Sequence, residues 1–177
     1  MKRLGSFSVV ACALALASSA AHAKPVGTLT CSSSSSGQLK FNVSFFNFGL
    51  DNTLNIGSQS SGAGAGKVTF SPLEVHASLS TFATLMSAAA NGSAFQSCLL
   101  NTTLSDGSQT EFEFKLVAIK SLNAVASMPA QANEPARYTD VNFEYGAIEV
   151  RSTGSADDGG TGTTTTGGWN IVTNQNQ

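Results

Sequence analysis

Residues 110–122, TEFEFKLVAIKSL, constrain the fold most strongly, because apolar and polar side chains alternate from Glu111 to Leu116. A period of two places the apolar side chains on one face of an extended chain. Glu111, Glu113 and Lys115 then point the opposite way. The segment predicts a β-strand with one buried face, whose inward residues are Phe112, Phe114, Leu116 and Ala118.

The same period recurs in further segments, which predict additional strands: residues 38–50, 67–77, 94–104 and 141–150. The phase changes at Phe45 and Phe46, at Pro72 and at Gly146, so a bulge or bend is expected at each place. Short strands separated by turns rich in Ser, Asn and Gly predict a mainly β fold.

One short helix is expected between the second and third of these segments. Ser78 or Ser80 can cap its start, and Asn91 with Gly92 supplies its end. Its apolar stripe is predicted to comprise Leu79, Phe82, Ala83, Met86 and Ala90. The opposite face has no basic residues, so we expect the stripe to cover an open end of the sheet rather than to bind a membrane or cofactor.

Charge is scarce in this chain. Its 177 residues include 9 Lys and Arg and 11 Asp and Glu, which together make 11% of the chain and a formal net charge of -2. An average soluble domain has about 25% charged residues. No Lys or Arg cluster follows residue 3, so nucleic acid is not an expected partner. The length and the 41% hydrophobic content suit a single domain.

Residues 1–23 have the features of a secretory signal peptide. Two basic residues open the chain, an apolar run spans residues 9–17, and Ala-His-Ala precedes the expected cut between Ala23 and Lys24. Residues 24–177 then form the exported domain, which we expect in the periplasm or outside the cell. A lipoprotein alternative stays open, because Val9-Val10-Ala11 before Cys12 is similar to a lipobox. No later stretch reaches the roughly 18 apolar residues of a membrane span.

Two cysteines, Cys31 and Cys98, remain after such cleavage. An even pair in an exported chain predicts a disulfide, and two separate buried thiols are the alternative.

Two segments are predicted to be loops. Residues 57–66, GSQSSGAGAG, are rich in Gly and Ser but fail as a phosphate cradle, because Lys67 is followed by Val68 and position 61 is Ser. Residues 152–168 are rich in Gly and Thr and are expected to be a disorder-prone loop before a last strand at residues 169–172.

Catalytic chemistry has little support in the sequence. Glu74 and His76 share a strand face, but no nucleophile signature such as GxSxG accompanies them. Glu111 and Glu113 also share a face, as paired carboxylates do in glycoside hydrolases, yet a solvated strand face is the better interpretation. Metal-ligand spacings are absent, so neither a metal nor a cofactor is expected.

The order of several segments resembles the haemolysin-coregulated (Hcp) family of type VI secretion tube proteins. These segments are GAGAGKVTF, the helix, VNFEYGAIEV, and a Gly/Thr-rich stretch followed by GGWNIVTNQ. The resemblance runs from about Leu39 to the C-terminus. It implies a small two-sheet β-barrel with one helix packed at its side.

The resemblance also implies a function without catalysis. Hcp-like chains assemble as hexameric rings that stack into a hollow tube and carry effector proteins. The loop with Gly62, Gly64, Gly66 and Lys67 would then contact a neighbouring subunit. Strands with apolar residues on both sides, as around Val117, also predict a partner surface.

The region before Leu39 departs from the family, and so does the signal peptide, because known tube proteins are built in the cytoplasm. Three hypotheses follow. The first is an exported Hcp-like protein that assembles into rings, the second is an exported monomeric binding or adhesion module, and the third is a secreted hydrolase.

Overall fold

The computed structural model describes residues 25–34, 37–52, 68–127, 136–156 and 160–176. The expected signal peptide and the Gly/Ser-rich loop at residues 57–66 lie outside this part of the chain, and so do Ala23, Lys24 and Lys67.

Strands dominate the described chain, and one α-helix follows a short 3-10 turn. In chain order the elements are β1 Gly27–Ser33, β2 Gly37–Asn47, β3 Leu50–Asn52, β4 Val68–Phe70, β5 Leu73–Ser78, η1 Leu79–Thr81, α1 Phe82–Ala90, β6 Ala94–Thr103, β7 Gln109–Ser127, β8 Ala136–Glu144, β9 Ala147–Ser155, β10 Thr161–Asn170 and β11 Gln175–Asn176.

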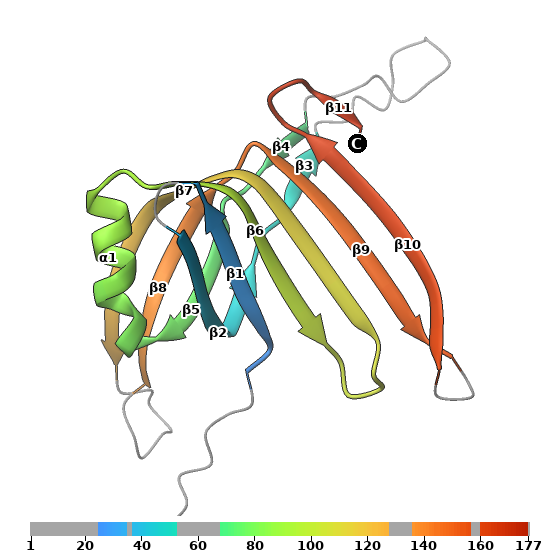
Figure 1. Ribbon diagram of the computed structural model, residues 1–177, viewed down its shortest axis with the longest axis horizontal. Coiled ribbons are helices and arrows are strands. Elements are labelled where there is room, and N and C mark those ends of the chain that lie inside the picture. The colour runs from blue at the N-terminus through green and yellow to red at the C-terminus, as the bar shows by residue number, and fades with distance from the viewer. Residues whose placement is uncertain (1–24, 35–36, 53–67, 128–135, 157–159, 177) are drawn as a thin grey trace, which may run out of the picture.

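A nine-stranded sheet in the order β11-β10-β9-β7-β6-β1-β2-β5-β8 wraps round until β8 pairs with β7. That pairing closes a six-stranded barrel, and β9, β10 and β11 continue beyond it as an extension (Figure 1). β3 and β4 form a separate two-stranded sheet. The predicted mainly β barrel with one helix at its side is therefore confirmed.

The barrel is filled by the inward side chains of its six strands. Side chains fully excluded from solvent come from β1, β2, β5, β6, β7 and β8, among them Leu29, Val43, Leu73, Leu100, Phe114 and Phe143, and Leu85 of the helix is also fully buried. Tyr145, just after β8, stacks edge-on against Phe114 at 4.9 Å between ring centroids. Its hydroxyl donates to the Ser71 carbonyl oxygen at 3.0 Å. Apolar burial from every strand makes the barrel one core.

β7 does not keep the strict alternation that its sequence predicts. Phe114 is buried, but Leu116 is 66% exposed and Val117 takes the next inward position. The cause is the backbone of Leu116, whose φ of 55° lies in the left-handed region and turns the strand. The inward placement expected for Leu116 and Ala118 is therefore wrong.

A close backbone contact supports this turn in β7. Gly146 donates its N–H to the Lys115 carbonyl oxygen at 2.9 Å, and its own carbonyl accepts from Ile171 N at 2.9 Å. A Cβ at Gly146 would lie 3.0 Å from Leu116 Cδ1 and 3.2 Å from Val172 Cγ2. A side chain here would crowd Leu116 and Val172 where β8 passes into β9. A bulge or bend was predicted at Gly146. In the structure the strand is interrupted there, because β8 ends at Glu144 and β9 begins at Ala147.

The other predicted irregularities are also present. The register between β2 and β5 shifts between Val43 and Phe45, one position before the expected place. Ser71 and Pro72 separate β4 from β5. Both features bend the chain without removing the inward side chains of the barrel.

The helix begins and ends near the predicted residues but buries a different face. The Ser78 side chain accepts from Ser80 N and caps η1, and Gly92 has the positive φ of 61° that ends α1. Leu85 is its one buried residue, whereas Met86 is 52% exposed. The predicted stripe is wrong because Leu79 belongs to the 3-10 turn, where three residues per turn change the phase.

The Gly/Thr-rich segment is the largest correction to the sequence prediction. Residues 152–168 were expected to be a disorder-prone loop, but β9 continues to Ser155 and β10 begins at Thr161. Pairs such as Thr164 with Thr153 extend the ladder, and the two hydroxyls hydrogen-bond at 3.0 Å. Threonine suits a strand, and a paired neighbour supplies the backbone partners that the local sequence does not reveal. The expected last strand at 169–172 is instead the end of β10 and a turn.

None of the helices in the described ranges is both long and apolar enough to cross a bilayer.

Replacing Gly146 with Ala should lower the free energy of unfolding by about 1–3 kcal/mol, because the new methyl group overpacks against Leu116 and Val172. Gly167→Ala is the matched control, since no atom lies within 4 Å of its added Cβ. Urea unfolding of both variants measures the difference. Equal stability of the two variants would show that the Gly146 contact does not constrain the fold.

Candidate functional site

An apolar groove lies where the barrel meets its extension. Its walls come from the end of β2, from β3 and β4, and from β9 and β10, and its volume is about 360 Å³. Phe48, Leu50 and Phe70 form one side, and Ile148 and Trp169 form the other. Leu50 is 61% exposed at this groove. An open apolar groove of this kind suits a protein partner better than a polar ligand.

The groove stays open because β10 carries two glycines beside it. Gly167 and Gly168 add no side chains to the wall, and a Cβ built on Gly167 meets no atom within 4 Å. Trp169 follows them and contributes the large apolar surface. The sequence predicts a loop at these glycines, so it gives no sign of the groove.

Aromatic side chains fix the inner wall of the groove. Phe48 packs edge-on against Phe112 and Phe114 of β7, with ring centroids 5.2 and 5.3 Å apart. Phe70 contacts Tyr145 in the same edge-on manner at 6.5 Å. These contacts join the β2 end and β4 to the barrel core, so the groove has a rigid base.

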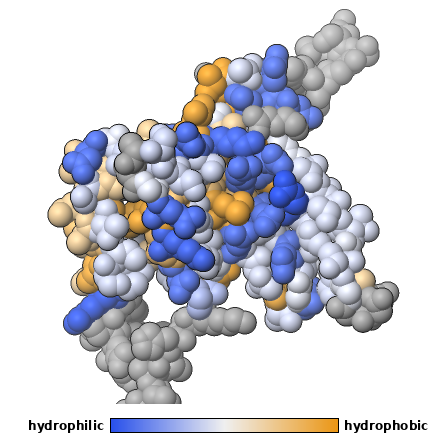
Figure 2. Space-filling model, viewed as in Figure 1, coloured by the Kyte–Doolittle hydropathy of each residue, from blue (hydrophilic) through white to orange (hydrophobic). Residues whose placement is uncertain are grey.

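β10 also presents an open strand edge beside the groove. In the described chain its residues 161–168 pair only with β9, and β11 reaches only Trp169 and Asn170. The sequence of this edge, TGTTTTGG, contains no charge and no proline. Figure 2 shows this ribbon, on the right of the view, in the pale colours of weakly polar residues. Unpaired edges without charge or proline are templates for pairing with another chain.

Cys31 and Cys98 are joined by a disulfide. They face each other in the register of β1 and β6, and both are excluded from solvent. The crosslink spans 67 residues of sequence and ties two central barrel strands together.

The predicted subunit-contact loop, with Gly62, Gly64, Gly66 and Lys67, lies outside the described residues. In the chain, β3 precedes this loop and ends at Asn52, and β4 follows it and begins at Val68.

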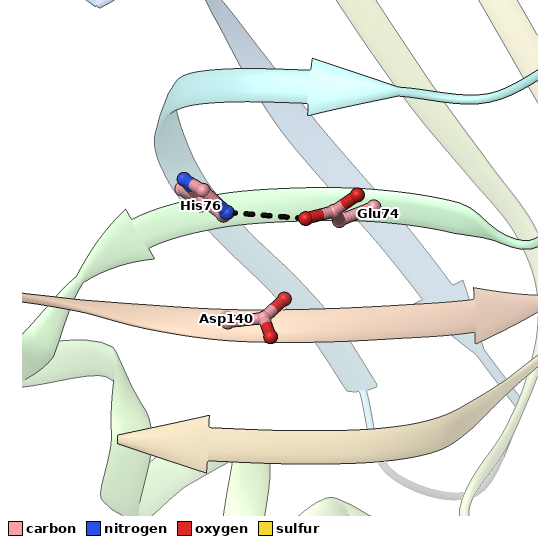
Figure 3. A group of neighbouring side chains, drawn as sticks. All are labelled: Glu74, His76 and Asp140. Carbon is pink, nitrogen blue, oxygen red and sulfur yellow. Dashed lines mark hydrogen bonds and ion pairs between the residues drawn. The ribbon is translucent and has the colours of Figure 1, made fainter. Parts of the chain in front are cut away.

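Glu74 and His76 lie together as their spacing predicts. His76 Nε2 is 3.3 Å from Glu74 Oε1, and their side chains are 22% and 36% exposed. β8 adds Asp140, directly opposite His76 in the ladder (Figure 3). Asp140 could not be predicted as part of this group, because strand pairing across a separation of 64 positions leaves no local signal in the sequence.

Glu111 and Glu113 belong to a surface ion-pair network. Arg151 contacts Glu111 at 3.1 Å and Glu149 at 3.0 Å, and Lys115 lies 3.6 Å from Glu113. The adjacent depression holds only about 20 Å³, which is too small for a sugar ring. This geometry favours a solvated strand face over a glycosidase site.

No family model matches the sequence, and no curated protein matches it. Solved structures do match. A type six secretion system protein superposes with a TM-score of 0.68 and 21% identity over 86% of this chain and 99% of its own. Hcp1 from Salmonella typhimurium superposes with a TM-score of 0.60 and 12% identity over 86% of this chain and 99% of its own.

A type VI secretion system effector from Yersinia pestis superposes with a TM-score of 0.54 and 8% identity over 82% of this chain and 99% of its own. These likenesses cover nearly the whole length of each matched structure. The chain therefore has the fold of Hcp proteins.

Replacing Cys31 and Cys98 together with Ala should cost about 4 kcal/mol of unfolding free energy, because the crosslink restricts a long loop of the unfolded chain. Urea unfolding of the double variant and of the disulfide-intact chain measures this loss. An unchanged midpoint would contradict a stabilising role for the crosslink.

Burial, together with a smaller contribution from the negative charge of Glu144, raises the pKa of Tyr145 to about 12. A raised pKa means that the folded state favours the protonated phenol. This stabilisation is complete below pH 10 and is lost as the pH rises from about 10 to 12. Tyr145→Phe should therefore flatten the fall in stability across that window, as measured by urea unfolding at successive pH values. A parallel fall in both proteins would contradict the assignment.

Proposed function

We propose that this chain is an exported, non-catalytic structural protein that assembles with copies of itself into rings, as a tube-like component or effector carrier of type VI secretion. The observation that carries the proposal is the open β10 edge beside the apolar groove, on a fold shared with Hcp proteins. Each feature supplies a different part of an interface.

The open edge supplies backbone hydrogen bonds. A strand from a second copy can pair with residues 161–168 without displacing any described strand. Backbone groups make the hydrogen bonds in such pairing, so it does not require particular side chains. The uncharged Thr and Gly residues at this edge do not oppose it. A copy that adds a strand here also removes the exposed edge that a single chain leaves open.

The groove supplies the apolar area. Leu50 projects from β3 with most of its surface in solvent, next to Phe48, Phe70 and Trp169. Leu116 and Val172 are also largely exposed, and both lie beside Gly146 between β8 and β9. A monomer that exposes this much apolar surface gains stability when a partner covers it.

Export is the second part of the proposal. It rests on the signal-like residues 1–23 and on the buried Cys31–Cys98 disulfide, which is typical of oxidising compartments. Export separates this chain from a tube that is assembled in the cytoplasm. The proposed rings therefore form after translocation.

The first test is the solution mass of the tag-free, disulfide-intact chain after export, by light scattering on a sizing column with electron micrographs of any large peak. We expect a closed ring of about six subunits. A monomer at all accessible concentrations would contradict ring assembly. That outcome would favour the alternative of a monomeric binding or adhesion module.

The second test places the interface. Leu50→Lys should weaken assembly by at least about 100-fold, because a charge would be buried in an apolar contact. Leu104→Lys is the matched control, since Leu104 is 57% exposed but lies at the β6–β7 turn, away from the groove. Equal effects of the two variants would show that the groove is not the contact surface.

A further inference from the structure

Three side chains on the outer face of the barrel converge on one point. Glu74 and His76 come from β5 and Asp140 comes from β8, and one ligand atom from each lies within 4.8 Å of the other two. Figure 3 shows the three side chains on the same face of the two paired strands. The cluster combines an imidazole nitrogen with two carboxylate oxygens, so it is more than an acidic patch.

The imidazole of His76 is held in place by rings on both sides. Tyr138 stacks on it at 4.2 Å between ring centroids with an interplanar angle of 25°, and Phe45 lies 4.6 Å away. Phe45 comes from β2 and Tyr138 from β8, so neighbouring strands restrict the ring from both directions. A ring with limited freedom loses little entropy when it binds a ligand.

Asp140 is also oriented by its neighbours. Asn123 of β7 donates its Nδ2 hydrogen to Asp140 Oδ2 at 3.3 Å, and Asn142 donates to Oδ1 at 3.5 Å. Both donors are neutral amides. They orient the carboxylate without neutralising its charge, as partners of metal-binding carboxylates do.

The charge of the cluster is not balanced by Lys or Arg within the described chain. Glu74 pairs only with His76, and no ion pair to Asp140 occurs there. Four other glutamates of the same sheet each have a Lys or Arg within 4.0 Å: Glu111 and Glu113 of β7, Glu144 of β8 and Glu149 of β9. The cluster therefore attracts a cation, and its partial exposure allows an ion to reach it.

We propose that Glu74, His76 and Asp140 bind one divalent transition-metal ion of the Zn²⁺ class. Imidazole and carboxylate ligands suit Zn²⁺ and its neighbours, whereas Ca²⁺ and Mg²⁺ prefer sites made only of oxygen. Three protein ligands leave a fourth position for water or for a group from another molecule. The ion replaces the contact between His76 and Glu74 and links β5 to β8. This site does not depend on the proposed ring assembly.

The direct test is calorimetric titration of the tag-free, disulfide-intact chain with Zn²⁺ after dialysis against a chelator, and with Co²⁺ followed by absorption spectroscopy. We expect one saturable site, a Co²⁺ spectrum of a nitrogen and oxygen environment, and at least 100-fold weaker binding of Mg²⁺ and Ca²⁺. The chain must carry no histidine tag, because a tag would itself bind Zn²⁺. The sequence has only two histidines, His22 and His76. Absence of saturable Zn²⁺ binding would overturn the proposal.

Variants assign the site to its residues. His76→Gln and Asp140→Asn should each weaken Zn²⁺ binding by at least about 100-fold, and Asn123→Ala by about 10-fold through the orientation of Asp140. Glu144→Gln is the matched control, because it removes a carboxylate from the same strand that pairs with Lys120 instead. It should leave the affinity unchanged. Equal weakening in Glu144→Gln and in Asp140→Asn would mean that the negative surface charge attracts Zn²⁺ without a defined site, and would overturn the proposal.

Folding is monitored by the unfolding midpoint of each variant without metal. The three cluster residues are partly exposed on an outer face, so the midpoints should stay close to that of the original chain. Added Zn²⁺ should then raise the midpoint of the original chain and of Glu144→Gln, but not that of His76→Gln. An equal rise in all three proteins would also overturn the proposal.

Discussion

The contact between Gly146 and Leu116 determines how the sheet is divided. Leu116 turns β7 in its middle, and Gly146 packs against that turn where β8 passes into β9. Residues 109–115 of β7 therefore pair with β9, whereas residues 118–127 pair with β8 along the same edge. One strand thus closes the barrel and also begins the extension. The turn at Leu116 lies between the residues that pair with β9 and those that pair with β8.

The two halves of the molecule have different physical properties as a result. The barrel has a closed sheet, a filled core and the Cys31–Cys98 crosslink, so it is the stable part. The extension has exposed Thr and Gly residues on an open edge, and its base forms the apolar groove. The crosslinked barrel and the open edge proposed for assembly therefore lie on different strands. The His76 cluster lies on the closed barrel, where ring stacking and the register of β5 and β8 fix its geometry.

Predictions from the sequence were most accurate where one local signal decided the structure. The strands within residues 94–104 and 141–150 and the helix end at Gly92 follow from alternation and from residues that favour turns. In the turn between β6 and β7, Asp106 Oδ1 accepts from Ser108 N and Oγ, and these hydrogen bonds lower the pKa of Asp106. Predictions failed where a distant partner decided the outcome. Leu116 faces outward because Gly146 leaves room for the turn, and 30 residues separate the two.

The sequence by itself determined the mainly β class, several of the segments that become strands and the single helix, and it favoured a disulfide between the two remaining cysteines. These depend on side-chain period and composition, which are properties of neighbours along the chain. Only the tertiary structure decided that residues 161–168 form a strand, that Leu85 rather than Met86 is the buried helix residue, and that Asp140 joins Glu74 and His76. The physical reason is that strand register and face burial are set by partners far away in sequence, whose contribution outweighs local propensity.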